Sequence, residues 1–216
     1  MNIIYEDAAI AVCIKPAGVQ SQLSGAGRDM ITLLNAYFAE KGENAEAFPV
    51  HRLDRETAGV MVYAKTKQAA ATLSAQIAAN KMHKRYFAVI KGTPQQKEDV
   101  LKDLLFHDKQ KNKTYAVSRM RKGVKEASLE YKIIGENEGF SLADILLHTG
   151  RTHQIRAQFS GRGFPIYGDR KYGGCNGDLA LFAYSLEFVH PVSGKNCVYT
   201  AQPEKNTHPW NLFDLK

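Results

Sequence analysis

The sequence has few cysteines and no long apolar run. Its 216 residues include three cysteines, at Cys13, Cys175 and Cys197. An odd number at such wide spacing argues against a disulfide framework and favours a reducing compartment. No apolar stretch approaches the ~20 residues of a membrane-spanning helix, so no membrane partner is expected. The first residues include acids and lack the basic flank and apolar run of a signal peptide, so the predicted location is cytoplasmic.

Motifs for nucleotides, metals and common nucleophiles are also missing. The sequence contains neither GxxxxGK[ST] nor GxGxxG, the loops that bind nucleotide phosphates, and it contains no GxSxG turn. His148 and His153 lie five residues apart with no third ligand nearby, which favours local hydrogen bonding over a metal site. The sequence therefore contains no recognisable site for a nucleotide cofactor, and no metal ion is expected at the two histidines.

Positive charge is concentrated in one region. The net charge is +7, yet residues 81–125 contain 13 Lys and Arg against 4 Asp and Glu, a local +9, so that the rest of the chain sums to −2. Such a surface suits phosphate groups, because each cation near a nucleic-acid backbone adds salt-dependent affinity. A solvated basic loop without a partner is the alternative.

The pattern of apolar residues predicts an α+β fold. Hydrophobic residues make up 44% of the chain, and a single domain over residues 1–216, built on a mixed, mostly antiparallel sheet flanked by helices and loops, is expected. The predicted strands include residues 9–15, 60–64, 84–91, 127–133 and 140–147. The predicted helices begin at Asp29, at Lys67 and, with Thr152 as the capping residue, before Ile155. Residues 25–28 are expected to form a loop, 107–125 a long loop or hairpin, and 100–106 either a strand or a short helix.

Three polar residues lie at the ends of apolar strands. Asp54 stands between two arginines in the stretch HRLDRETAG, which leads into the strand at 60–64. Tyr86 lies in KRYFAV, and Arg151 in LLHTGRTHQIR. Each has an ordinary interpretation as a surface ion pair, a packed aromatic ring or a charge near a helix start. Taken singly, none of the three establishes a reactive site.

Taken together with their neighbours, these residues form five ordered blocks that extend through most of the chain. The blocks are KPAG at 15–18, HRLDRETAG at 51–59, KRYFAVIKG at 84–92, TGRTHQIR at 149–156 and PIYGDRKYG at 165–173. In this set the chain resembles the RluA-type family of RNA pseudouridine synthases, in the form without an N-terminal RNA-binding domain. It differs at Ala58, where the family usually has Ser, and at Gln158, where His is frequent. Neither position coincides with a residue to which a chemical role is assigned below.

The resemblance implies an isomerase of the pseudouridine synthase fold that detaches uracil from its ribose, rotates it and rejoins it through carbon five, without cofactor or metal. It implies that Asp54 is the catalytic aspartate, whether by attack on the ribose, addition to the ring or stabilisation of an elimination intermediate. Arg151 would pair with Asp54, since an unpaired buried carboxylate would take up a proton. Tyr86 would stack on the uracil, and its hydroxyl could take part in proton transfer.

The same resemblance implies a structured RNA as the partner, either tRNA or rRNA. The target uridine must leave its stack to reach Asp54, and Arg52 is the candidate to fill the vacated space. Ile155 is expected to form an apolar wall beneath the base. Lys15 is expected either to contact a phosphate or to be structural. No protein partner is implied, and a monomer is expected.

Two other functions are compatible with parts of the sequence. A protein of the same fold could bind RNA without catalysis, although the presence of Asp54, Tyr86 and Arg151 argues against it. A phosphate-ester hydrolase with an aspartate nucleophile would need acidic metal ligands in a recognisable motif, and none is evident. Which RNA and which uridine are modified, and at how many sites, is left open.

Overall fold

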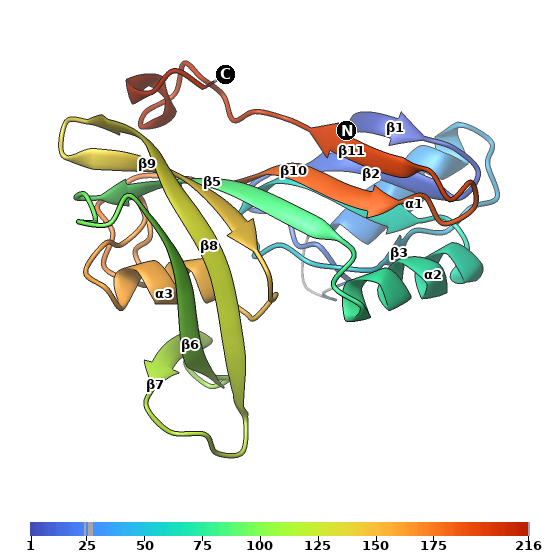
Figure 1. The fold of residues 1–216 in the computed structure, drawn as a ribbon. Helices are drawn as coiled ribbons and strands as arrows, with labels where there is room; N and C mark the ends of the chain where they lie inside the picture. Colours follow the sequence, from blue (N-terminus) through green and yellow to red (C-terminus); the bar gives the residue numbers. More distant parts are fainter. Residues whose placement is uncertain (24, 26–27, 216) are drawn as a thin grey trace. The chain divides into compact units, whose positions relative to one another are not determined.

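The computed structural model describes residues 1–23, 25 and 28–215. Its contacts divide the chain into two compact units. The first unit comprises Met1–Lys84 and Ala183–Ala201, and the second comprises Arg85–Phe182 and Gln202–Lys216. Both contain antiparallel strand pairs accompanied by helices (Figure 1), which confirms the α+β class. The single domain predicted for residues 1–216 stays a prediction, and the loop predicted at 25–28 lies partly outside the described residues.

The first unit is a sheet in the order β1-β2-β4-β10, in which β3 also pairs with β4 and β11 with β10. The pairings β1–β2, β2–β4, β3–β4 and β10–β11 are antiparallel. Its elements are β1 (Asn2–Glu6), β2 (Ile10–Lys15), α1 (Met30–Glu40), β3 (Phe48–Pro49), β4 (Ala58–Ala64), α2 (Lys67–Ala78), most of β10 (Leu181–Val189) and β11 (Asn196–Thr200).

The central strands of this sheet are apolar on both faces, as the sequence predicts. Almost every residue of β2 and β4 is buried, and α2 packs Ala69 and Leu73 into one apolar cluster with residues of β2, β4 and β10. The predicted start of α1 is confirmed, because the Asp29 carboxylate accepts the amide hydrogen of Thr32 (2.9 Å). β4 is thus a rigid support for the turn that precedes it.

The second unit is a sheet in the order β5-β9-β8-β6-β7. Its elements are β5 (His83–Lys91), which begins in the first unit, β6 (Glu98–Asp108), β7 (Lys113–Val117), β8 (Val124–Asn137), β9 (Phe140–Leu147), α3 (Gln154–Ser160) and a short 3-10 helix, η1 (Trp210–Leu212). The strand predicted from alternating apolar residues at 127–133 is confirmed, since Ala127, Leu129, Tyr131 and Ile133 of β8 are all buried.

The basic region forms a strand hairpin rather than an irregular loop. Residues 100–106 belong to β6, which pairs with both β7 and β8. The hairpin closes where Asp108 faces Lys113, and the segment 118–123 then joins β7 to β8. Figure 1 shows these strand ends extending beyond α3. Residues 109–125, called the basic arm below, carry seven Lys or Arg and no Asp or Glu.

Candidate active site

Asp54 lies in a tight turn at the entrance to β4. Its side chain is half-buried, and its backbone carbonyl accepts the amide hydrogen of Thr57 at 3.0 Å. The turn passes directly into Ala58 and Gly59, the first residues of β4. Gly59 is required there, because a Cβ atom at this position would lie 2.3 Å from the backbone oxygen of Ala183. The carboxylate therefore stands at the end of a buried strand, as the sequence predicts.

Both neighbours of Asp54 are held by the segment that follows β2. Ser21 donates its hydroxyl to the carbonyl of Leu53 (2.7 Å) and accepts the Leu53 amide hydrogen (3.0 Å). On the other side, the carbonyl of Arg55 accepts the amide hydrogen of Gly18 (2.9 Å), whose positive φ of 79° favours glycine. Asp54 therefore lies between two fixed residues, an arrangement that preorganises a reactive side chain.

Lys15 also supports the Asp54 turn. Its side chain is fully buried, and its ammonium group donates to the carbonyls of Pro16 (2.8 Å), Val19 (2.7 Å) and Arg55 (2.9 Å). Burial lowers the pKa of Lys15 to about 8, against the carboxylates of Glu56 and Asp54, which favour the protonated form. All three ammonium hydrogens are used within the protein, so of the two alternatives left open by the sequence, the structural role accounts for this geometry.

Replacement of Lys15 by methionine should lower stability and leave RNA affinity unchanged. The variant loses three charge-assisted hydrogen bonds, so we expect a loss of about 2–3 kcal/mol in the free energy of unfolding. RNA affinity should not change, because Lys15 has no exposed surface that a phosphate could reach. Urea unfolding and filter binding of total tRNA and rRNA at two salt concentrations measure the two effects. A smaller salt dependence of binding in the variant would instead assign Lys15 to a phosphate.

His51 begins the same motif and is buried as a neutral side chain. Its Nε2 atom accepts the amide hydrogen of Val62 in β4 (3.2 Å), so the ring proton of the neutral form lies on Nδ1. Nδ1 has no hydrogen-bond partner among the described residues. Burial, assisted by the charge of Lys84, lowers the pKa of His51 to about 3. The imidazole therefore anchors the turn to β4 and does not serve as a proton donor at neutral pH.

The free energy of unfolding should decrease as the pH is lowered, because His51 is buried in its neutral form. Between its unfolded pKa of 6.5 and its folded pKa of about 3, the unfolded chain binds a proton that the native state excludes, so acid favours unfolding. His51→Gln retains an acceptor and removes the titration. From pH 7 to pH 5, we expect wild type to lose about 2 kcal/mol more unfolding free energy than the variant. Equal losses in urea unfolding at the two pH values would contradict a buried neutral imidazole.

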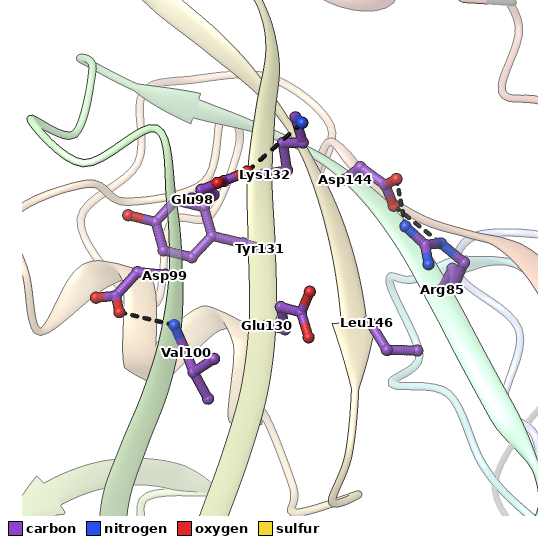
Figure 2. Close-up of a pocket in the computed structure, with 9 residues that line it drawn as sticks. All are labelled: Arg85, Glu98, Asp99, Val100, Glu130, Tyr131, Lys132, Asp144 and Leu146. Atoms are coloured by element: carbon purple, nitrogen blue, oxygen red, sulfur yellow. Dashed lines mark hydrogen bonds and ion pairs between the residues drawn. The ribbon is translucent and has the colours of Figure 1, made fainter.

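Tyr86 lies on β5 in the second unit and is buried, with 5% of its surface exposed. Its neighbour Arg85, whose side chain points to the opposite face of the strand, pairs with Asp144 of β9 at 2.6 Å. The pair borders a groove of about 410 Å³. Figure 2 shows this pair and the residues of β6, β8 and β9 around it.

This groove does not suit an RNA backbone. Its lining includes four carboxylates, and both of its cations are paired with carboxylates, Arg85 with Asp144 and Lys132 with Glu98 (Figure 2). The excess negative charge repels phosphate. Arg85 lies on the face of β5 that borders this groove, and Tyr86 lies on the opposite face.

Arg151 is half-buried just before α3 and is held through both its side chain and its backbone. Its Nε donates to the carbonyl of Glu126 in β8 (2.9 Å), and its amide hydrogen is accepted by Oε1 of Gln154 (3.0 Å). The same Oε1 atom accepts the hydroxyl of Thr149 (2.8 Å), and the Gln154 amide group donates to the carbonyl of Ser128 (3.1 Å). Gln154 thus fixes the backbone of Arg151 against β8.

The prediction that Thr152 caps α3 is wrong. The N-cap residue is His153, which has a left-handed conformation (φ 52°), and within the described residues it makes no side-chain capping hydrogen bond. The left-handed residue turns the chain sharply and places Thr152 one position too early for capping. Ile155, in the first turn of α3, is buried with 5% of its surface exposed.

The TGRTHQIR and PIYGDRKYG blocks meet in a buried ion pair. Arg156 donates to both carboxylate oxygens of Asp169, at 2.7 and 2.8 Å, and the side chains are 8% and 0% exposed. The predictions above did not include this pair, although opposite charges in two separate motif blocks were the signal for it. Ser21 was also missed, because a lone serine after a Pro-Gly turn carries no distinctive pattern.

The predicted site residues fall in both units. Lys15, Arg52 and Asp54 belong to the first, where Lys15 supports the Asp54 turn and the Arg52 side chain is exposed. Tyr86, together with Arg151 and Ile155, belongs to the second. The pairing of Asp54 with Arg151 and the stacking of Tyr86 on uracil stay predictions.

The described residues contain no group of three His, Cys, Asp or Glu side chains placed to hold a metal ion. Among the same residues, no helix is long and apolar enough to cross a membrane.

Comparison with known proteins identifies the family. A model of the family described as RNA pseudouridylate synthase matches residues 9–161. An uncharacterized RNA pseudouridine synthase of Aquifex aeolicus is 35% identical, with 97% of this chain and 72% of that protein covered. A ribosomal large subunit pseudouridine synthase D of Xanthomonas campestris is 34% identical, and the match covers 90% of this chain but only 63% of that protein.

Two solved structures have a similar fold. The solved structure of human RNA Pseudouridylate Synthase Domain Containing 4 matches with a TM-score of 0.77 at 23% identity, covering 94% of this chain and 89% of that one. Human RNA Pseudouridylate Synthase Domain Containing 1 also matches with a TM-score of 0.77. These likenesses show the pseudouridine synthase fold, and the resemblance drawn from the five motif blocks is confirmed. The chain therefore belongs to the family of RNA pseudouridine synthases, which are isomerases of uridine in RNA.

Proposed function

We propose that the protein converts one or more specific uridines of a structured tRNA or rRNA into pseudouridine, with Asp54 as the catalytic aspartate. The observation that carries the proposal is the position of Asp54, half-buried between Leu53 and Arg55, which are both tethered by hydrogen bonds. The backbone that carries the Asp54 side chain is thus fixed before substrate binds. Relatives named as ribosomal large subunit synthases support rRNA as one of the two candidate classes.

The other predicted residues complete the proposed site. Arg151 pairs with the Asp54 carboxylate, and Tyr86 stacks on the uracil. Ile155 provides an apolar surface beneath the base. Arg52, which is exposed, occupies the space left when the uridine leaves its stack. The widely spaced cysteines support action in the reducing cytoplasm, and we propose a monomeric enzyme.

Pseudouridine mapping tests this proposal. Total RNA from cells with and without the gene is compared, and a gene carrying Asp54→Asn is introduced into the deletion strain. We expect at least one pseudouridine to disappear on deletion, to return with the wild-type gene and to stay absent with the variant. If every pseudouridine persists in the deletion strain, the result favours a protein that binds RNA without modifying it.

The basic arm is the proposed contact with the RNA backbone. Six of its seven cations are exposed: Lys109, Lys111, Arg119, Arg121, Lys122 and Lys125. They lie in the turn between β6 and β7, in the segment 118–123 and at the start of β8, and the pairing of these three strands anchors both connections. An array of exposed cations without carboxylates attracts phosphates independently of base sequence.

Neutralising three arm cations should weaken the binding of all structured RNAs. For Lys109→Gln, Arg119→Gln and Lys122→Gln combined, we expect the slope of log affinity against log salt to fall in magnitude by about 2–3. The matched control replaces Lys67, Lys132 and Lys195, which are exposed outside the arm, and has the same net charge. If both triple variants change the slope equally, the effect comes from net charge and the arm makes no specific contact.

A further inference from the structure

Thr114 joins the base of the basic arm to residues 148–153, the loop between β9 and α3 that is called the Arg151 segment below. Thr114, in β7, is buried with 2% of its surface exposed. Its hydroxyl donates to the carbonyl of Thr152 at 2.7 Å, and Thr152 directly follows Arg151. Thr114 is therefore part of the hairpin that carries the cations, and it also contacts the loop that contains Arg151.

The hydrogens of this contact can be assigned by elimination. Because the Thr114 hydroxyl donates to Thr152, its oxygen is left to accept, and Nδ1 of His107 at 3.0 Å must be the donor. The Thr114 amide hydrogen is accepted by the hydroxyl oxygen of Tyr172 (2.7 Å). That hydroxyl lies 3.1 Å from Nδ1 of His153. The hydroxyl of Thr114 thus contacts Thr152 in the Arg151 segment, and its amide group contacts Tyr172, which lies beside His153.

The Arg151 segment is clamped from two sides. Gln154 holds the amide hydrogen of Arg151, as described above, while Thr114 holds the carbonyl of the next residue. The Arg151 side chain reaches from this backbone to the carbonyl of Glu126. A long side chain magnifies small rotations of its own backbone. Loss of the Thr114 clamp should therefore displace the guanidinium of Arg151.

The arm itself has other attachments. Lys171 donates to the carbonyl of Asn112 (2.9 Å), and the ammonium of Lys113 lies over the ring of Tyr172 (5.1 Å). The paired strands β6 and β7 also fix the hairpin. Loss of the Thr114 hydroxyl alone therefore leaves these attachments of the arm in place, while it removes the bond to His107 and one of the two clamps on the Arg151 segment.

We propose that Thr114 is a positioning residue for Arg151, and that it couples the basic arm to the loop that carries Arg151. The inference rests on the role proposed for Arg151. The threonine touches neither uridine nor Asp54 in this proposal. It acts on the rate of the reaction through the Thr152 carbonyl.

Three variants test the proposal. Thr114→Val removes the hydroxyl and keeps the shape, whereas Thr114→Ser restores the hydroxyl without the methyl group. Ser141→Ala is the matched control, because Ser141 is also fully buried in the second unit and its hydroxyl also donates to a carbonyl, that of Gly92 (2.9 Å). Ser141 makes a second bond to the Thr93 hydroxyl (2.9 Å), as Thr114 does to His107.

The probe is total RNA from cells that lack the gene, labelled with tritium at carbon five of uracil, which is released when pseudouridine forms. Single-turnover measurements with excess enzyme separate the limiting rate from the enzyme concentration at half-maximal rate. For Thr114→Val we expect the limiting rate to fall about tenfold, equivalent to ~1.4 kcal/mol in the barrier, with the half-maximal concentration within about twofold of wild type. Thr114→Ser should recover most of the rate, and Ser141→Ala should keep it.

Several outcomes of these rate measurements overturn the proposal. They are an unchanged limiting rate in Thr114→Val, an equal loss in Ser141→Ala, and a serine variant no better than valine. A rise in half-maximal concentration alone also overturns it, because Thr114 would then position only the arm.

A second measurement separates this inference from the proposed function. The NMR signal of the Arg151 Nε–H group, recorded without RNA, should shift or broaden in Thr114→Val and return in Thr114→Ser. If wild-type protein releases no tritium, the proposed function fails, whereas an unchanged Arg151 signal in Thr114→Val shows that the positioning role fails.

Discussion

Replacement of Asp54 by asparagine should abolish pseudouridine formation and leave RNA binding largely intact. The variant keeps the shape of the side chain and the turn that ends at Thr57, but it removes the negative charge on which each of the possible mechanisms depends. We expect the rate to fall on the order of 10⁴-fold or more, the scale seen when a principal catalytic side chain is removed. Tritium release from uracil-labelled RNA measures the rate, and filter binding measures the affinity.

The matched control for this prediction is Glu56→Gln. Glu56 lies two residues further along the same turn, is exposed and pairs with Arg55 at the surface. Its replacement removes the same charge near Asp54, so a general electrostatic effect of the turn would affect both variants. Substantial turnover by Asp54→Asn would exclude Asp54 as the catalytic residue, whatever the control shows.

Removal of the Asp169 carboxylate should be the most destabilising change away from the reaction site. In Asp169→Ala the guanidinium of Arg156, whose side chain is only 8% exposed, is left without its bidentate carboxylate. Breaking a buried ion pair from one side costs about 3–5 kcal/mol, because the remaining buried charge loses its counter-ion. The urea concentration at the midpoint of unfolding measures the loss.

Two further variants serve as comparisons for the predicted effect of Asp169→Ala. In the double variant Arg156→Met, Asp169→Leu no charge is left in the interior, so we expect most of the stability to return. Arg162 and Asp103 form a more exposed pair, with 35% and 17% of their side chains accessible, and Asp103→Asn should cost less than about 1 kcal/mol. Equal losses in Asp169→Ala and Asp103→Asn would mean that burial does not set the strength of these pairs.

Local patterns in the sequence were sufficient for several elements of secondary structure in both units and for the family. The Asp29 cap, the apolar strand at 60–64 and the alternation of β8 depend on residues close together in the chain, and the structure contains all three. The five motif blocks are likewise local patterns in a fixed order. Asp54 could be singled out because it lies inside one such block.

The partners of individual side chains could not be obtained in that way. Lys15 could have met a phosphate or a carbonyl, and its contact with Arg55 joins residues 40 apart. The bond from Thr114 to Thr152 joins residues 38 apart, and the mistaken cap at Thr152 reflects a left-handed His153 that no local pattern indicated.

The sequence by itself determined the family, the α+β class and the identity of the candidate catalytic aspartate, because each depends on residue types in a local order. Only the tertiary structure decided that Lys15 supports the Asp54 turn, that Arg156 pairs with Asp169 and that Thr114 holds the loop of Arg151. The physical reason is that a buried polar group takes whichever partner the folded backbone places within about 3 Å of it, and residues far apart in the chain acquire that proximity only on folding.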